Sequence, residues 1–189
     1  MTRNSAIVVV DMLYDFIDGS LACRNADTAV AECRKFILAH RQHSWGVPPV
    51  LFIRDCHPGN HCSFTGQGGD WPVHCVEGTR GAKIHADLQE FADEDLTFFK
   101  GRDPKAEQYS GTEGTNPAGQ SLTEVLGIMD CSDIYVCGIA TEFCVKNTVL
   151  DLLKAGFKVN VVKAALAYVD ENGHVKALEE MEAEGARLV

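Results

Sequence analysis

Short apolar runs alternate along this chain with segments in which apolar residues recur at helical spacing. The runs are typical of buried strands and cover residues 5–10, 50–53, 96–99, 134–138, 159–162 and 187–189. The helical patterns cover residues 28–43, 121–129, 138–153 and 175–184. Alternating strands and helices with short connections predict a single α/β domain over residues 1–189, with three αβα layers, a mainly parallel central sheet and a Rossmann-like architecture.

One connecting segment is far longer than the others. Residues 57–79 are rich in Gly, His and Cys and show no sustained periodicity. A loop of this length in a small domain is more often functional than idle. We therefore expect this segment to contribute to a site.

Composition and charge exclude two classes of partner. The chain has 189 residues, a net charge of −10 and a sequence pI near 5.1, so its field repels nucleic acids and anionic membrane surfaces. The first apolar run ends at Asp11, too soon for a signal peptide core or a membrane span. Eight cysteines are spread through strand-like and helix-like segments. We expect a cytoplasmic protein whose thiols are mostly reduced.

Polar and reactive side chains follow the predicted strands. Asp11, Asp55 and Lys100 each come at or just after the end of a separate apolar run, and Cys144 lies beyond a fourth. Parallel sheets bind ligands at the carboxyl ends of their strands. The sequence therefore predicts that these four residues converge on one edge of the sheet.

The stretch around Cys144 passes directly from a strand pattern into a helix pattern. Thr141 is a good N-cap, which predicts that Cys144 lies in the first helical turn. The free amides and the helix dipole there favour an anion, so we expect the thiol to ionise more readily than in water. The alternative is that Cys144 is a small buried core residue.

Asp11, Lys100 and Cys144 together suggest nucleophilic catalysis. An ammonium beside the thiol would stabilise a thiolate, and a carboxylate within hydrogen-bond reach could accept the thiol proton and later return it. The alternative is that Asp11 and Lys100 form an ordinary structural ion pair at the sheet edge.

A second group of residues suggests a metal site. In an extended segment Asp55 and His57 point the same way, and His74 from the same loop would supply a third ligand. Zinc, iron(II) or manganese suits these ligands, with positions left open for water or substrate. Two alternatives remain: a closed structural zinc site that uses Cys56, Cys62 and Cys75 with the histidines, or ordinary loop residues.

These residues carry a resemblance to a known family over residues 7 to about 162. The motifs are Val8-Val9-Val10-Asp11, Asp15-Phe16 with Gly19-Ser20-Leu21, Asp55-x-His57-Pro58 with His61-x-Ser63-Phe64, Trp71-Pro72-Val73-His74-Cys75 with Gly78-Thr79, Lys100-Gly101, Tyr109-Ser110, and Gly138-Ile139-Ala140-Thr141-x-x-Cys144-Val145. In this order and spacing, the chain resembles the nicotinamidases (pyrazinamidases) of the isochorismatase-like cysteine hydrolase superfamily.

The resemblance implies hydrolysis of nicotinamide to nicotinate and ammonia in NAD salvage, through a cysteine thioester, with pyrazinamide as a further substrate. By motif match, Cys144 is the nucleophile, Asp11 the proton carrier and Lys100 the group that lowers the thiol pKa. A cis peptide between Ile139 and Ala140 would turn the amides of Ala140 and Cys144 toward an oxyanion.

The resemblance also implies a substrate site and a cofactor. One divalent metal ion, zinc first among the candidates, would be held by Asp55, His57 and His74 and would bind the pyridine nitrogen. His61 is either a further ligand or a donor to one. The substrate-binding residues implied are Phe16, Leu21, Trp71, Tyr109 and Ile139.

Other functions remain open at this point. A related amidohydrolase acting on another small amide, such as an N-carbamoyl compound, would use the same Asp, Lys and Cys but is not expected to carry the metal motif. A non-catalytic binder of nicotinamide or metal would keep the pocket without turnover. A homo-oligomer is compatible with the sequence, which does not specify the oligomeric state.

Overall fold

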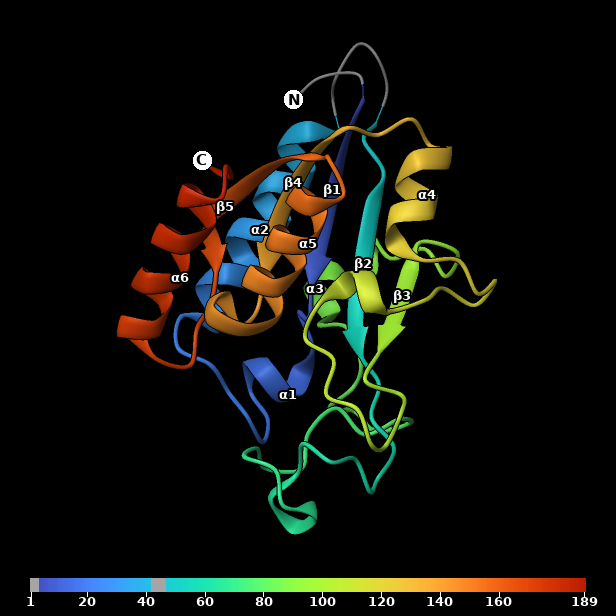
Figure 1. Ribbon diagram of the computed structural model, residues 1–189, viewed down its shortest axis with the longest axis vertical. Helices are drawn as coiled ribbons and strands as arrows, with labels where there is room; N and C mark the ends of the chain where they lie inside the picture. Colours follow the sequence, from blue (N-terminus) through green and yellow to red (C-terminus); the bar gives the residue numbers. More distant parts are fainter. Residues whose placement is uncertain (1–3, 42–46) are drawn as a thin grey trace.

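Six parallel strands form one sheet in the part of the chain that the computed structural model describes, residues 4–41 and 47–189 (Figure 1). The order across the sheet is β3-β2-β1-β4-β5-β6. The strands are β1 (Ser5–Val10), β2 (Val50–Asp55), β3 (Thr97–Lys100), β4 (Asp133–Gly138), β5 (Lys158–Leu166) and β6 (Arg187–Leu188). The parallel sheet predicted from the apolar runs is confirmed.

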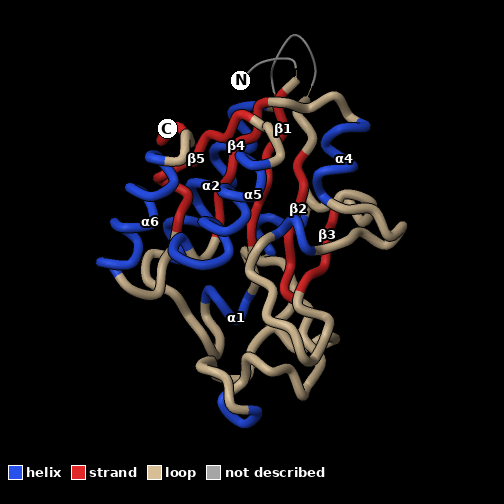
Figure 2. Tube along the Cα trace, viewed as in Figure 1, coloured by secondary structure: helices blue, strands red, loops and turns tan. Residues whose placement is uncertain are grey.

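Helices cover both faces of this sheet (Figure 2). They are α1 (Tyr14–Ile17), α2 (Ala26–His40), α3 (Ala86–Gln89), α4 (Leu122–Ile128), α5 (Lys146–Lys154) and α6 (Glu171–Ala183). Ala29, Cys33 and Ile37 of α2 pack into one core, whereas α4, α5 and α6 pack into the core on the opposite face. The three-layer αβα architecture expected from the sequence is therefore correct.

Strand β1 shows why the sheet is buried on both sides. Ile7 and Val9 belong to the core under α2, while Ala6, Val8 and Val10 belong to the other core. All six residues of β1 are buried. Alternating side chains thus serve two apolar layers, which explains the uninterrupted apolar run in the sequence.

Some elements differ from the sequence predictions. The four-residue helices α1 and α3 were not predicted, because one turn of helix leaves no apolar repeat to detect. Helix α6 begins at Glu171, four residues before the predicted start, with Asp170 accepting a hydrogen bond from the amide of Gly173. Residues 42–43, predicted as the end of the helix now seen as α2, lie outside the described residues.

The strand order reverses direction at β1. The chain first builds outward from β1 to β2 and β3, then returns to place β4 on the other side of β1. Gly138 closes β4 against β1: its φ is 142°, and a Cβ there would lie 2.1 Å from the carbonyl oxygen of Val10. Open α/β sheets bind ligands at such a reversal, outside the carboxyl ends of the strands.

No helix among residues 4–41 and 47–189 is long and apolar enough to cross a membrane.

Candidate active site

The four strand-end residues predicted from the sequence do converge. Asp11 follows β1, Asp55 ends β2, Lys100 ends β3, and Cys144 lies beyond β4. The side chain of Lys100 reaches all three others. Its ammonium lies 2.9 Å from Asp11 Oδ2, 2.5 Å from Asp55 Oδ1 and 3.4 Å from Cys144 Sγ. Contact with the thiol makes this more than the ordinary ion pair considered above.

Burial makes this cluster electrostatically strong. Lys100 is 1% exposed and Asp11 is fully buried. Asp11 is further fixed through its Oδ1, which accepts a hydrogen bond of 2.8 Å from the amide of Asp55. Interactions between charges are stronger in such a low-dielectric interior than at the protein surface. The position of each group therefore affects the protonation of the others.

The direction of each pKa follows from that balance. Burial, aided by the Asp55 charge and opposed by Lys100, raises the pKa of Asp11 to about 6. Burial would also raise the pKa of Asp55, but Lys100 and His57 outweigh it and hold that pKa below its ordinary value. Burial would lower the pKa of Lys100, yet the negative groups around it keep that pKa well above its ordinary value.

The thiol itself does not follow the sequence prediction. Burial raises the pKa of Cys144 well above its ordinary value, and Lys100 opposes this rise without cancelling it. The expectation of a readily ionised thiol is therefore wrong, because loss of solvent outweighs the neighbouring ammonium. Asp11, whose carboxylate lies within 4.8 Å of Cys144 Sγ, is placed to take the proton.

The backbone around Cys144 also differs from the prediction. Residues Thr141–Val145 form a π-helical turn that leads into α5, and Ala140 rather than Thr141 occupies the N-cap position. The Thr141 hydroxyl instead donates to the carbonyl of Ala167 at 3.0 Å, so the N-cap prediction for Thr141 is wrong. π-helical turns of this kind are frequent at functional sites.

The peptide bond between Ile139 and Ala140 is cis, as the family resemblance implied. The carbonyl of Ala140 accepts hydrogen bonds of 3.1 Å from the amides of Phe143 and Val145. Within the described chain, the amide of Ala140 donates to no other group. It is therefore available to a ligand beside Cys144.

Asp55, His57 and His74 form a compact group of metal-ligating atoms, all within 4.8 Å of one another and all buried. His57 Nδ1 donates to the carbonyl of Gly101 at 2.9 Å, and His74 Nδ1 donates to that of Pro72 at 2.7 Å. Each backbone carbonyl can only accept, so the neutral ring keeps an unprotonated Nε2. This is how ligating histidines are usually oriented in metal sites.

One observation tests directly whether these residues fit a metal ion. His57 Nε2 is buried and has no hydrogen-bond partner among the described residues. Buried polar atoms are rarely left in this state. An ion bound by His57 Nε2 and the nearby carboxylate of Asp55, 3.5 Å away, would satisfy it. The residues present therefore fit a divalent cation.

His61 lies beside this group but is used differently. Its ring centroid is 4.1 Å from that of His57, yet Nδ1 pairs with the Ser63 hydroxyl at 2.7 Å and Nε2 with the carbonyl of Ala106 at 3.1 Å. Both ring nitrogens are therefore occupied. Of the two roles left open for His61, the structure favours a residue that supports the metal ligands over a metal ligand itself.

The closed thiolate site considered for the loop does not form. Among the described residues, the groups with metal-ligand geometry are Asp55-His57-His74 and Asp11-Asp55-Cys144, and neither includes Cys56, Cys62 or Cys75. The Cys75 thiol instead contacts the carbonyl of Gly81 at 3.9 Å.

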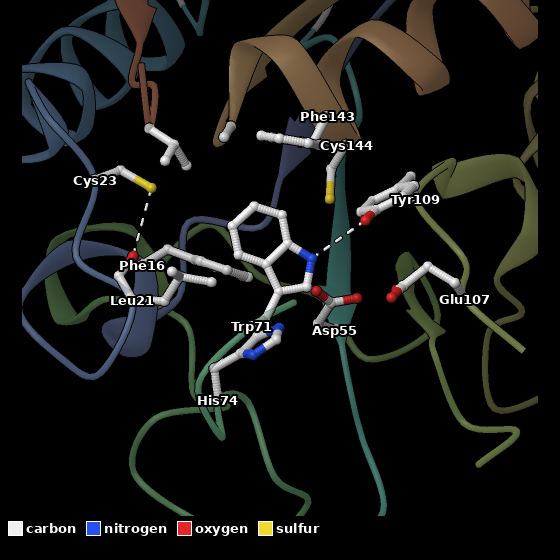
Figure 3. Close-up of a pocket in the computed structure, with 12 residues that line it drawn as sticks. Phe16, Leu21, Cys23, Asp55, Trp71, His74, Glu107, Tyr109, Phe143 and Cys144 are labelled. Atoms are coloured by element: carbon white, nitrogen blue, oxygen red, sulfur yellow. Dashed lines mark hydrogen bonds between the residues drawn. The ribbon is translucent and has the colours of Figure 1, made fainter. Parts of the chain in front are cut away.

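A pocket opens over the thiol and the metal-ligating group (Figure 3). Its walls are Phe16, Leu21, Cys23, Asp55, Trp71, His74, Glu107, Tyr109, Ala140, Phe143, Cys144 and Val169. Figure 3 shows the Trp71 indole between Leu21 and Tyr109, with its Nε1 donating to the Tyr109 hydroxyl at 3.2 Å. The Phe143 ring packs edge-on against the Trp71 indole, with the two ring centroids 5.0 Å apart. The pocket is thus a largely aromatic slot with polar groups at one end.

Four of the five expected substrate contacts line this pocket, namely Phe16, Leu21, Trp71 and Tyr109. Ile139 does not, because its side chain is fully buried in the core under α2. Four further lining residues were not predicted: Cys23, Glu107, Phe143 and Val169. Phe143 could have been found from its place beside Cys144, but the other three carry no signal in the sequence.

Comparison with known proteins gives the same family over the whole described site. The family model described as "Isochorismatase domain" matches residues 5–189. The nicotinamidase/pyrazinamidase of Mycobacterium tuberculosis is 34% identical over 187 residues, which cover 97% of each chain.

Solved structures agree with this match. The pyrazinamidase of Pyrococcus horikoshii, in complex with zinc, aligns with a TM-score of 0.88 and 36% identity over 98% of each chain. The PnC1 protein of L. infantum, in complex with nicotinate, aligns with a TM-score of 0.86 and 28% identity over 100% of this chain and 94% of its own. The matched sequence, the sheet order and the four convergent side chains lead to one conclusion: this chain belongs to the isochorismatase family.

Proposed function

We propose that this protein hydrolyses nicotinamide, and also pyrazinamide, to the carboxylate and ammonia, as a step of NAD salvage. The observation that carries this proposal is the contact of Lys100 with both Asp11 and Cys144 at the end of an aromatic pocket. The relatives named above, one of them in complex with nicotinate, support the same substrate class.

The reaction follows from the positions of these groups. Asp11 takes the proton of the Cys144 thiol, and the thiolate attacks the carboxamide carbon. The resulting oxyanion is stabilised by the amides of Ala140 and Cys144, in the role the family resemblance implies. Asp11 then gives its proton to the departing nitrogen, which leaves as ammonia, and a thioester remains on Cys144.

Hydrolysis of the thioester reverses these roles. Asp11 accepts a proton from a water molecule, whose oxygen attacks the thioester carbon and displaces the sulfur. The sulfur regains a proton and the carboxylate product leaves. Lys100 stays charged throughout. Burial alone would lower its pKa, but the surrounding negative groups outweigh burial and hold that pKa well above its ordinary value.

We further propose that Asp55, His57 and His74 hold one divalent ion, zinc first among the candidates. When bound, such an ion supplies a Lewis-acid contact for the ring nitrogen of the substrate. The aromatic walls Trp71, Tyr109 and Phe16 hold the ring plane, which orients the carboxamide toward Cys144. All eight cysteines are free thiols, which supports action in the reducing cytoplasm.

Two alternatives have less support. An amidohydrolase for an N-carbamoyl compound would leave the buried donor group of His57 and His74 without a use. A non-catalytic binder would not need Asp11 and Lys100 arranged around a thiol.

The decisive test is ammonia release from nicotinamide by metal-loaded protein and by its Cys144→Ala variant. We expect turnover in the wild type and a loss of at least about 10³-fold in the variant, since covalent catalysis needs the sulfur. Cys62→Ala removes a thiol outside the pocket and is the matched control with unchanged turnover. Turnover that survives in Cys144→Ala would exclude the thiol mechanism. The absence of ammonia release from the metal-loaded wild type would exclude nicotinamide as the substrate.

A further inference from the structure

The π-helical turn is tied to one wall of the pocket by two adjacent side chains. The amide and hydroxyl of Thr141 both donate to the carbonyl of Ala167, at 2.9 and 3.0 Å. Glu142 Oε1 accepts from the amides of Val169 and Asp170, at 2.9 and 2.7 Å. Residues 167–170, which we call the wall segment, are thereby held against the turn that carries the nucleophile.

The Glu142 carboxylate is itself held in place. Its Oε2 is buried without a hydrogen-bond partner among the described residues. The aliphatic part of the Glu142 side chain packs on the first turn of α6, where a Cβ on Gly173 would lie 3.4 Å from Glu142 Cγ. The half-buried side chain of Glu142 therefore lies between the wall segment and the first turn of α6.

Within the wall segment, Glu142 holds the backbone at Val169, the residue that lines the pocket. The earlier part of the segment is secured by backbone hydrogen bonds between Arg24 and Tyr168, of 2.8 and 3.2 Å. The amides of Val169 and Asp170 have no acceptor other than Glu142 in the described structure. Hydrogen bonds to a carboxylate are stronger than those between neutral groups. Glu142 is thus the hydrogen-bond partner that fixes the backbone at Val169, whose side chain also packs against the core under α2.

We propose that Glu142 is a positioning residue that fixes Val169 as a wall of the substrate pocket, in register with the turn that carries Cys144. This inference rests on the proposed amidase function. Without the carboxylate, the wall segment populates conformations in which Val169 no longer closes the pocket. Apparent affinity falls in proportion to the competent fraction, while Cys144 stays in place through the hydrogen bonds to the Ala140 carbonyl.

The test compares Glu142→Ala with Glu142→Gln in steady-state kinetics on nicotinamide. We expect Glu142→Ala to raise KM by about fivefold or more and to change kcat by less than about twofold, because two hydrogen bonds of the wall are lost and none at the sulfur. Glu142→Gln retains an oxygen acceptor and should restore most of the affinity. Glu179→Ala, an exposed position of α6, should leave both constants unchanged.

Two further measurements keep the result interpretable if Glu142→Ala is unstable. Val169→Ala alters the wall without touching the carboxylate and should share the rise in KM. Hydrogen exchange should show faster exchange at the amides of residues 169 and 170 in Glu142→Ala but not in Glu142→Gln. Exchange does not depend on turnover, so it tests the restraint even if nicotinamide is not the substrate.

The outcomes separate cleanly. A drop in kcat with unchanged KM would place the effect of Glu142 on the thiol and overturn the proposal. Unchanged kinetics and unchanged exchange in Glu142→Ala would overturn it as well. A raised KM that glutamine does not restore, with unchanged exchange at residues 169 and 170 in Glu142→Ala, would show that Glu142 does not act through the wall segment, which also overturns the proposal.

Discussion

The side chain of Lys100 is a charge that the protein interior tolerates only because of its partners. Its ammonium is completely buried and lies between the carboxylates of Asp11 and Asp55. An isolated ammonium in such a place would be severely destabilising. Lys100 therefore contributes to the stability of the fold as well as to catalysis, and experiments can measure the two contributions separately.

We expect Lys100→Met to lose activity and also to destabilise the fold. The substitution leaves Asp11 and Asp55 as buried carboxylates without a cation, which typically costs about 3–5 kcal/mol of unfolding free energy. Denaturant unfolding measures this loss, and ammonia release measures the activity. Lys105→Met, at an exposed position, is the control, and a fully stable Lys100→Met protein would show that the cluster is not the buried ion network described here.

At the scale of elements, the turn after β3 shapes the metal-ligating group. Gly101 has φ +67°, and a Cβ there would lie 2.4 Å from Cε1 of the His57 ring. Its carbonyl at the same time accepts the hydrogen bond from His57 Nδ1. A single glycine thus sets both the space for the imidazole and its tautomer.

Substitution of that glycine should weaken metal binding more than folding. In Gly101→Ala the new methyl group must displace the His57 ring, so we expect a loss of metal affinity of about 10–100-fold, the range seen when groups supporting a ligand are altered. Gly119→Ala is a matched control, since Gly119 has φ +79° and open space around its Cβ position. Equal metal content in both variants after dialysis would contradict this role for Gly101.

The sequence predicts the elements that are long enough to carry a recognisable apolar pattern, and it misses the single-turn helices α1 and α3 although both bury apolar side chains. All six strands were found because each contains or adjoins a short cluster of apolar or β-branched residues, uninterrupted in β1 and broken by polar residues in β5. The π-helical turn was missed because the apolar pattern of residues 141–153 fits an ordinary helix. The convergence of Asp11, Asp55, Lys100 and Cys144 followed from parallel topology alone.

The parts of the site that could not be predicted depend on tertiary contacts. Cys23 and Val169 reach the pocket from loops whose approach is set by long-range hydrogen bonds, such as those of Glu142. The rise in the pKa of Cys144 was missed for a related reason. A sequence places Lys100 near the thiol but does not show how completely water is excluded.

For the molecule as a whole, metal binding should be visible in its stability. An ion that binds the folded chain but not the unfolded one stabilises the folded state by about 2.7 kcal/mol when its free concentration is 100 times its Kd. For a protein of this size we therefore expect chelation to lower the Tm by roughly 5–10 °C. The shift should be absent in His57→Ala and retained in His85→Ala, and a wild-type Tm indifferent to chelation and to added zinc would argue against the site.

The pocket contains two thiols, and this arrangement bears on covalent inhibition. Cys23 and Cys144 line the same cavity, and burial raises the pKa of Cys23 to about 12, so neither sulfur is a thiolate near neutral pH. Their surroundings differ in one respect: Cys144 has the Asp11 carboxylate beside it, whereas the Cys23 thiol faces the carbonyl of Leu21 at 3.5 Å. An electrophile carried on a pyridine ring would therefore be expected to bond to Cys144 and spare Cys23, its selectivity coming from the neighbouring base rather than from exposure.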